Sequence, residues 1–151
     1  IKATHASVKT NLRMLEAIAS HEVSIVAVIV DQQAIVRQPK DPEEIYRQAV
    51  TRAIHILLEH FPRVEICLDK RYTNEILRYE LEKHIRENLV DISPQLALIR
   101  QQSSHTRKEL QAADAVAWAF FQKYERGNSR FYDVIASKVL LEELIAKKKW
   151  K

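Results

Sequence analysis

Asp114 is the residue that most clearly suggests chemistry, because it lies in the mostly apolar stretch LQAADAVAWAFF at 110–121. On a helix it shares a face with Leu110 and Phe121, and the many alanines allow close packing, so we expect partial burial. A buried carboxylate needs an ion pair, hydrogen bonds, a metal ion or a proton. A structural role, with an arginine or backbone amides as partners, fits the sequence equally well.

Two further acids, Asp31 and Asp69, end predicted β-strands. Ligands of open α/β sheets bind outside the carboxyl ends of the strands, so both are candidates for a site. Lys70 and Arg71 follow Asp69 directly, and such cations keep a carboxylate ionised and can contact phosphate. Taken singly, each acid is better explained as a loop cap or a solvent-facing residue after a strand.

Several common sites are excluded by composition. The only glycine is Gly127, so neither a P-loop nor a dinucleotide-binding fingerprint is present. The only cysteine is Cys67, which rules out an internal disulfide and zinc sites built on paired cysteines. The histidines show no HExxH pattern.

The elements that must position these residues follow from hydrophobic spacing. We predict helices at about 6–20, 41–61, 73–88, 107–126 and 129–147, with Gly127 as the left-handed C-terminal cap of the fourth. We predict strands at 23–31, Val64–Asp69 and 96–100. This alternation predicts an α/β fold with three mostly parallel strands flanked by about five helices. So thin a sheet leads us to expect missing N-terminal strands, or a homo-oligomer formed through an open sheet edge.

Length and charge indicate one domain over residues 1–151. The chain is 46% hydrophobic and 29% charged, as in globular proteins. It has no signal peptide and no apolar run of about 20 residues, so we expect a cytoplasmic protein without a membrane partner. It opens without an initiator methionine, which is consistent with N-terminal truncation. The net charge of +4 is compatible with nucleic acid, although a terminal lysine cluster supplies much of it.

Three motifs together resemble the family called domain of unknown function 3800. They are IKATH at 1–5, ICLDKR at 66–71 and SSHTRKELQAADAVAWAFFQKYERGNSRFY at 103–132. The resemblance covers essentially the whole chain, and its most specific part is LQAAD with the apolar helix and KYERGN. It implies a ribonuclease-H-like fold and a metal-dependent nuclease.

The resemblance also implies roles for individual residues. Asp69 matches the acid of the family's DKR motif and Asp114 the acid of its LQxAD motif, so both would be catalytic ligands of Mg²⁺ or Mn²⁺. Lys70, Arg71 and Gln111 match positions that would support the cluster or contact phosphate. Asp31 is a further candidate ligand.

The sequence also departs from the family's pattern. The usual first strand with an Asp-Glu-Ser-Gly-like motif is absent, as is a glutamate expected before IKATH. We therefore expect an incomplete carboxylate site, with weak metal binding and little or no catalysis. Two alternatives remain: a non-catalytic binding or assembly module in which Asp114 is structural, and a hydrolase of small phosphorylated molecules.

Overall fold

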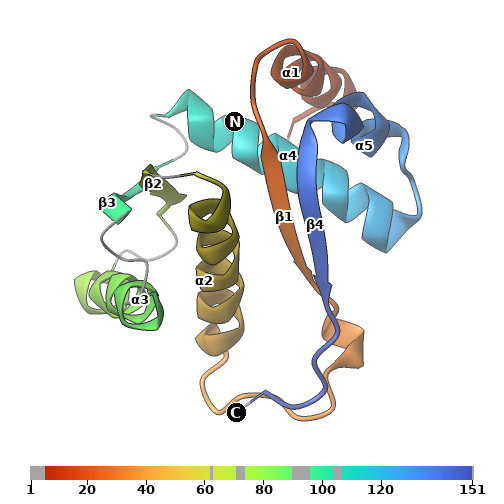
Figure 1. Cartoon of the computed structure of the whole chain (residues 1–151). Coiled ribbons are helices and arrows are strands. Elements are labelled where there is room, and N and C mark those ends of the chain that lie inside the picture. The colour runs from red at the N-terminus through yellow and green to blue at the C-terminus, as the bar shows by residue number, and fades with distance from the viewer. Residues whose placement is uncertain (1–5, 62, 71–73, 90–95, 104–106, 151) are drawn as a thin grey trace. The chain divides into compact units, whose positions relative to one another are not determined.

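Helices and short strands alternate along the chain (Figure 1), in a computed structural model that describes residues 6–61, 63–70, 74–89, 96–103 and 107–150. The helices are α1 (Val8–Ala19), α2 (Glu43–His60), α3 (Glu75–Asn88), α4 (Lys108–Arg126) and α5 (Arg130–Ile135), with short 3₁₀ turns η2 (Gln32–Ala34) and η4 (Ala136–Lys138). The strands are β1 (Ile25–Val30), β2 (Val64–Asp69), β3 (Leu96–Gln102) and β4 (Val139–Ile145).

The strands pair in parallel, β1 with β4 and β2 with β3. At the end of the first pair, the N–H of Asp31 donates to the carbonyl oxygen of Ile145 at 2.9 Å. At the end of the second, the N–H of Lys70 donates to the carbonyl oxygen of Gln102 at 2.7 Å. In each pair, the carboxyl ends of the two strands therefore lie side by side. This confirms the predicted α/β character with parallel strands.

The prediction of a helix over 129–147 was wrong, and with it the count of three strands. The helical part is only α5, and after η4 the chain continues as β4 beside β1. Leu, Glu, Ala and Lys favour helices, so the local sequence VLLEELIAKKK predicts one. In the folded chain, pairing with the β-branched strand β1 satisfies the backbone of β4 and overrides this preference.

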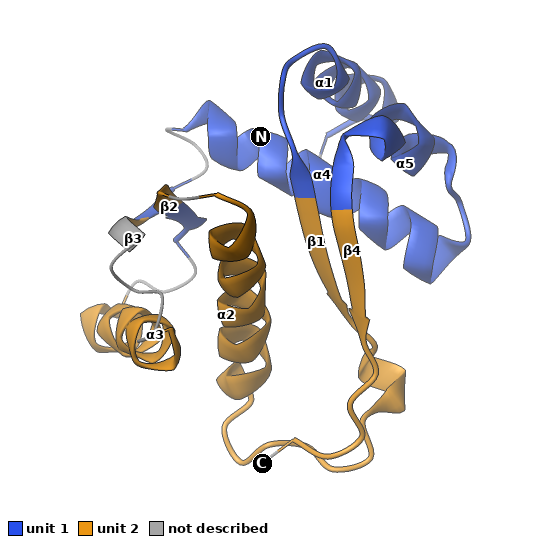
Figure 2. Cartoon of the chain, in the orientation of Figure 1, with its two compact units in different colours: residues 1–25, 67–70, 101–140 blue, residues 26–66, 71–100, 141–151 orange. Residues whose placement is uncertain are grey.

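The chain divides into two compact units (Figure 2), of which the first comprises residues 1–25, 67–70 and 101–140. Helices α1, α4 and α5 contact one another in this unit. Leu15, Ala119 and Ile135 are fully buried, and the rings of Trp118 and Phe131 lie 4.5 Å apart. The core of this unit is therefore the contact among three amphipathic helices.

Gly127 ends α4 with φ 63°, a left-handed conformation that costs other residues free energy. This confirms its predicted role as the C-terminal cap.

The second unit comprises residues 26–66, 71–100 and 141–151, and in it α2 packs against α3. Ile54 and Leu58 on α2, and Leu81 and Ile85 on α3, are buried at the four-residue spacing of a helix face. The prediction of one domain over 1–151 stays a prediction. Among the described residues, no helix is long and apolar enough to cross a membrane.

Candidate functional site

Asp114 lies on α4, one turn after Gln111, and both residues are half-buried. On the face predicted to carry Asp114, Leu110 is buried but Phe121 is 47% exposed. This face therefore passes from the core to the surface along the helix, with Asp114 at the boundary. Neither Gln111 nor Asp114 is without an interaction partner.

Asp69 is the last residue of β2 and is half-buried, whereas Lys70 is exposed. The strand end is held firmly, because the Lys70 N–H bonds to Gln102 and the Cys67 thiol donates to the Gln102 side-chain oxygen at 3.5 Å. Asp69, too, has an interaction partner. Arg71 lies outside the described residues, as do the residues of IKATH.

The first compact unit contains Asp69, Lys70, Gln111 and Asp114 together, although two sequence segments supply them. Asp31 belongs to the second unit, where its carboxylate accepts the N–H of Gln33 at 3.1 Å and caps η2. Within the part of the chain that the structure describes, no three His, Cys, Asp or Glu residues are grouped as a metal site. The first unit therefore contains two carboxylates, a cation and an amide among the predicted site residues.

Sequence patterns missed a polar network between α2 and α3 in the second unit. The hydroxyl of Thr51 donates to the carbonyl oxygen of Arg47 at 2.7 Å and lies 3.1 Å from Nδ1 of His84. Nε2 of His84 lies 3.5 Å from Oε1 of Glu44. The helical spacing of Glu44, Arg47 and Thr51 is visible in the sequence, but no spacing identifies His84 as their partner.

Arg47 is the charged centre of this network. It donates to the carboxylates of Asp41 at 2.6 Å and Glu44 at 3.1 Å, with only 12% of its own side chain exposed. The hydrogen bond from Arg47 lowers the pKa of Asp41. Burial raises the pKa of Glu44, but hydrogen bonds from Gln48 and Arg47 and the charges of His84 and Arg47 outweigh it, so the pKa is lowered. Both acids are thereby kept ionised and paired, as in a structural network.

The chain matches no protein-family model, no curated protein and no solved structure. Its similarity to domain of unknown function 3800 therefore rests on its motifs alone and stays a prediction. A function has to be argued from Asp69, Asp114 and the residues grouped with them.

Proposed function

We propose that the chain is a ribonuclease-H-like domain related to metal-dependent nucleases, with Asp69 and Asp114 as ligands of Mg²⁺ or Mn²⁺. What supports the proposal is that one compact unit contains both acids, one at a strand's carboxyl end and one on a helix. Both are half-buried, where a carboxylate gains more from a cation than it does in open water.

The chemistry would be hydrolysis of a phosphodiester. A divalent ion held by two carboxylates activates water and offsets the charge that builds on the phosphate. Lys70, exposed beside Asp69, would contact phosphate, and Gln111 would support Asp114 from one turn away. Because no three metal-binding side chains are grouped among the described residues, we expect weak metal binding and slow turnover.

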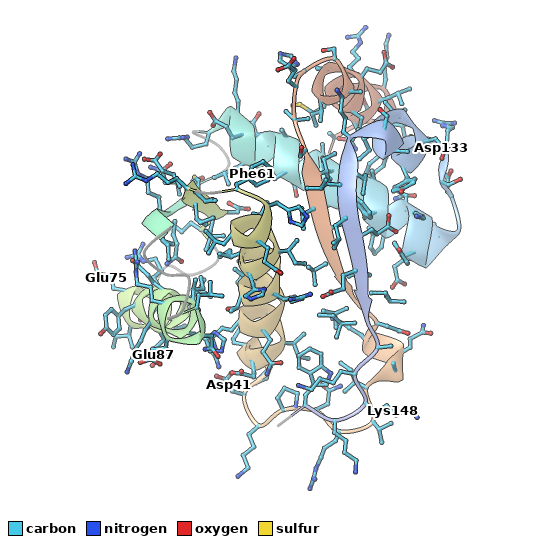
Figure 3. All side chains as sticks on the ribbon, viewed as in Figure 1. Asp41, Phe61, Glu75, Glu87, Asp133 and Lys148 are labelled. Atoms are coloured by element: carbon cyan, nitrogen blue, oxygen red, sulfur yellow. The ribbon has the colours of Figure 1, made fainter. Side chains whose placement is uncertain are left out.

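A cleavage assay on RNA, single-stranded DNA and plasmid DNA tests this proposal. We expect cleavage in Mg²⁺ or Mn²⁺ that Asp69→Asn and Asp114→Asn each abolish. Asp133→Asn is the matched control, since Asp133 is an exposed acid of α5 in the same unit (Figure 3). Metal-dependent cleavage that survives both aspartate substitutions would refute the assignment.

Binding is measured separately, because slow turnover could hide a real metal site. Titration of Mn²⁺, followed by the electron paramagnetic resonance signal of the free ion, should show binding that weakens in both aspartate variants and persists in Asp133→Asn. Equal binding by all four proteins would place the ion elsewhere.

A non-catalytic binding or assembly module is the second candidate. It is favoured by the lack of a three-ligand group among the described residues, and by Asp114 already having an interaction partner. This role predicts that Asp114→Asn lowers the melting temperature, and that Mg²⁺ and Mn²⁺ leave the melting temperature of the unaltered protein unchanged. A metal-dependent rise in melting temperature that is lost in Asp114→Asn would exclude it.

A further inference from the structure

One face of α4, in the first compact unit, exposes aromatic rings. Phe121 is 47% exposed and Tyr124 is 40% exposed, and residues three apart on a helix are neighbours on its surface. Asp114 lies on the same face two turns before Phe121, about 10 Å away along the helix axis. Ala117 lies between them, is exposed and adds only a methyl group. The face therefore leads from Asp114 to two accessible rings.

Cations lie beside these rings. The guanidinium carbon of Arg126 is 5.8 Å from the centre of the Phe121 ring. The ammonium of Lys123 is 5.2 Å from the centre of the Tyr124 ring and 3.7 Å from that of Tyr132. Such contacts hold a charge close to an aromatic surface. The exposed fractions of Phe121 and Tyr124 show that both rings still offer surface to a ligand.

Two arginines of this surface are not neutralised by an acid. Arg126 is exposed at the end of α4, and Arg130 is exposed at the start of α5, which packs against α4. Among the described residues neither arginine forms an ion pair, although the exposed acids Glu125 and Asp133 lie on the same two helices. Both guanidinium groups are therefore available to an anionic ligand.

We propose that this surface binds single-stranded nucleic acid, with unpaired bases stacked on Phe121 and Tyr124 and phosphates at Arg126 and Arg130. Accessible rings beside available arginines match a base joined to a phosphate, since the base stacks and the phosphate pairs with arginine. A duplex keeps its bases stacked inside, so they would not reach the rings. The proposal rests on the proposed nuclease, for which it names a single-stranded substrate lying along α4 towards Asp114.

Fluorescence anisotropy in EDTA measures binding without cleavage. The probes are labelled oligothymidine, labelled oligouridine and duplex DNA of the same length. We expect at least one single strand to bind about fivefold or more tightly than the duplex, the gain from one stacked base, and the tighter strand identifies the sugar. Charge alone would favour the duplex, whose phosphates are denser. A duplex bound as tightly as both single strands, or no binding of either strand at low salt, would overturn the proposal.

Ring removal then locates the surface. Phe121→Leu and Tyr124→Leu keep an apolar, helix-favouring side chain, and each should weaken single-strand binding about fivefold or more. Tyr79→Leu is the matched control, because Tyr79 is a 67% exposed ring on α3 in the other unit, and it should change the affinity less than about twofold. If Tyr124→Leu fails to fold, Phe121→Leu decides. Unchanged affinity in Phe121→Leu, or a dimer that Phe121→Leu dissociates in place of oligonucleotide binding, would overturn the proposal.

Salt dependence tests the phosphate contacts. Arg126→Gln and Arg130→Gln should each reduce the slope of log affinity against log salt by about 0.7, the value for one phosphate of a single strand. Unchanged slopes in both variants would overturn these contacts.

Asp114→Asn separates this surface from the proposed metal site. It should abolish cleavage in Mg²⁺ or Mn²⁺ without weakening single-strand binding in EDTA. Single-strand binding by a protein that shows no metal-dependent cleavage would support this surface and count against the nuclease alone.

Discussion

The ion pair between Arg52 and Glu143 joins α2 to β4, the strand whose sequence predicts a helix. Arg52 Nε and Nη2 donate to the two carboxylate oxygens of Glu143, both at 2.8 Å. The helix predicted over 129–147 would not by itself place the side chain of Glu143 in contact with Arg52. We therefore predict that Arg52→Gln and Glu143→Gln show a favourable coupling free energy in a double-mutant cycle.

The size of the coupling follows from geometry and exposure. The side chains of Arg52 and Glu143 are 41% and 30% exposed, so water and salt screen their attraction. Exposed ion pairs couple by about 0.2 to 1 kcal/mol, and the two-pronged geometry places this pair near the upper end, at about 1 kcal/mol. The hydrogen bond from Arg52 lowers the pKa of Glu143. The coupling should thus be complete above the ordinary glutamate pKa and disappear as pH falls through the lowered folded-state value.

Urea unfolding of the four proteins at neutral pH and low salt measures the coupling. The matched control is the pair Lys83 and Glu87 on α3, which are 56% and 64% exposed at 3.8 Å and should couple by at most about 0.3 kcal/mol. A coupling for Arg52 and Glu143 no larger than that of the control would refute the bidentate contact between α2 and β4.

Three further changes test other parts of the fold by urea unfolding. Gly127→Ala should cost about 1 kcal/mol through its backbone alone, since an added Cβ meets nothing within 4 Å, and a neutral result would contradict the left-handed cap. Ile135→Ala, at a fully buried position, should cost about 2 to 5 kcal/mol, against less than about 0.5 for exposed Ile76→Ala. The pKa of Glu44 is lowered even though burial opposes the shift. The ionised carboxylate should therefore contribute to the free energy of unfolding at neutral pH, and this contribution should be lost as pH falls through the lowered pKa. In Arg47→Gln, the free energy of unfolding should depend less on pH over this range.

Local signals predicted the features whose causes are local. Gly127 is predicted as a cap because helices often end at a left-handed residue, a conformation that costs glycine least, and the chain has no other glycine. The strand at Val64–Asp69 follows from its β-branched, apolar residues. β4 could not be found in this way, because what makes it a strand is pairing with β1, more than a hundred residues earlier in the chain.

Polar residues show the same division between local and long-range causes. Sequence patterns made Asp31 a candidate ligand, yet its carboxylate accepts the N–H of Gln33 two residues on, the ordinary role of an aspartate after a strand. No sequence pattern singles out His84, because its contacts to Thr51 and Glu44 form only when α2 packs against α3. A residue's own neighbours in sequence predict caps and turns, but not the partners that folding supplies.

Asp114 combines both causes. Its apolar surroundings in sequence predict partial burial, and it is half-buried, on a face where Leu110 is covered and Phe121 is not. A half-buried carboxylate with an interaction partner pays far less desolvation than a fully buried one, so burial alone does not require a metal ion here. A unit shared with Asp69 does not by itself separate Asp114 from an ordinary boundary acid, because Asp133 lies in that unit too. Only loss of metal binding in both Asp69→Asn and Asp114→Asn, with Asp133→Asn unaffected, would give that grouping a chemical meaning.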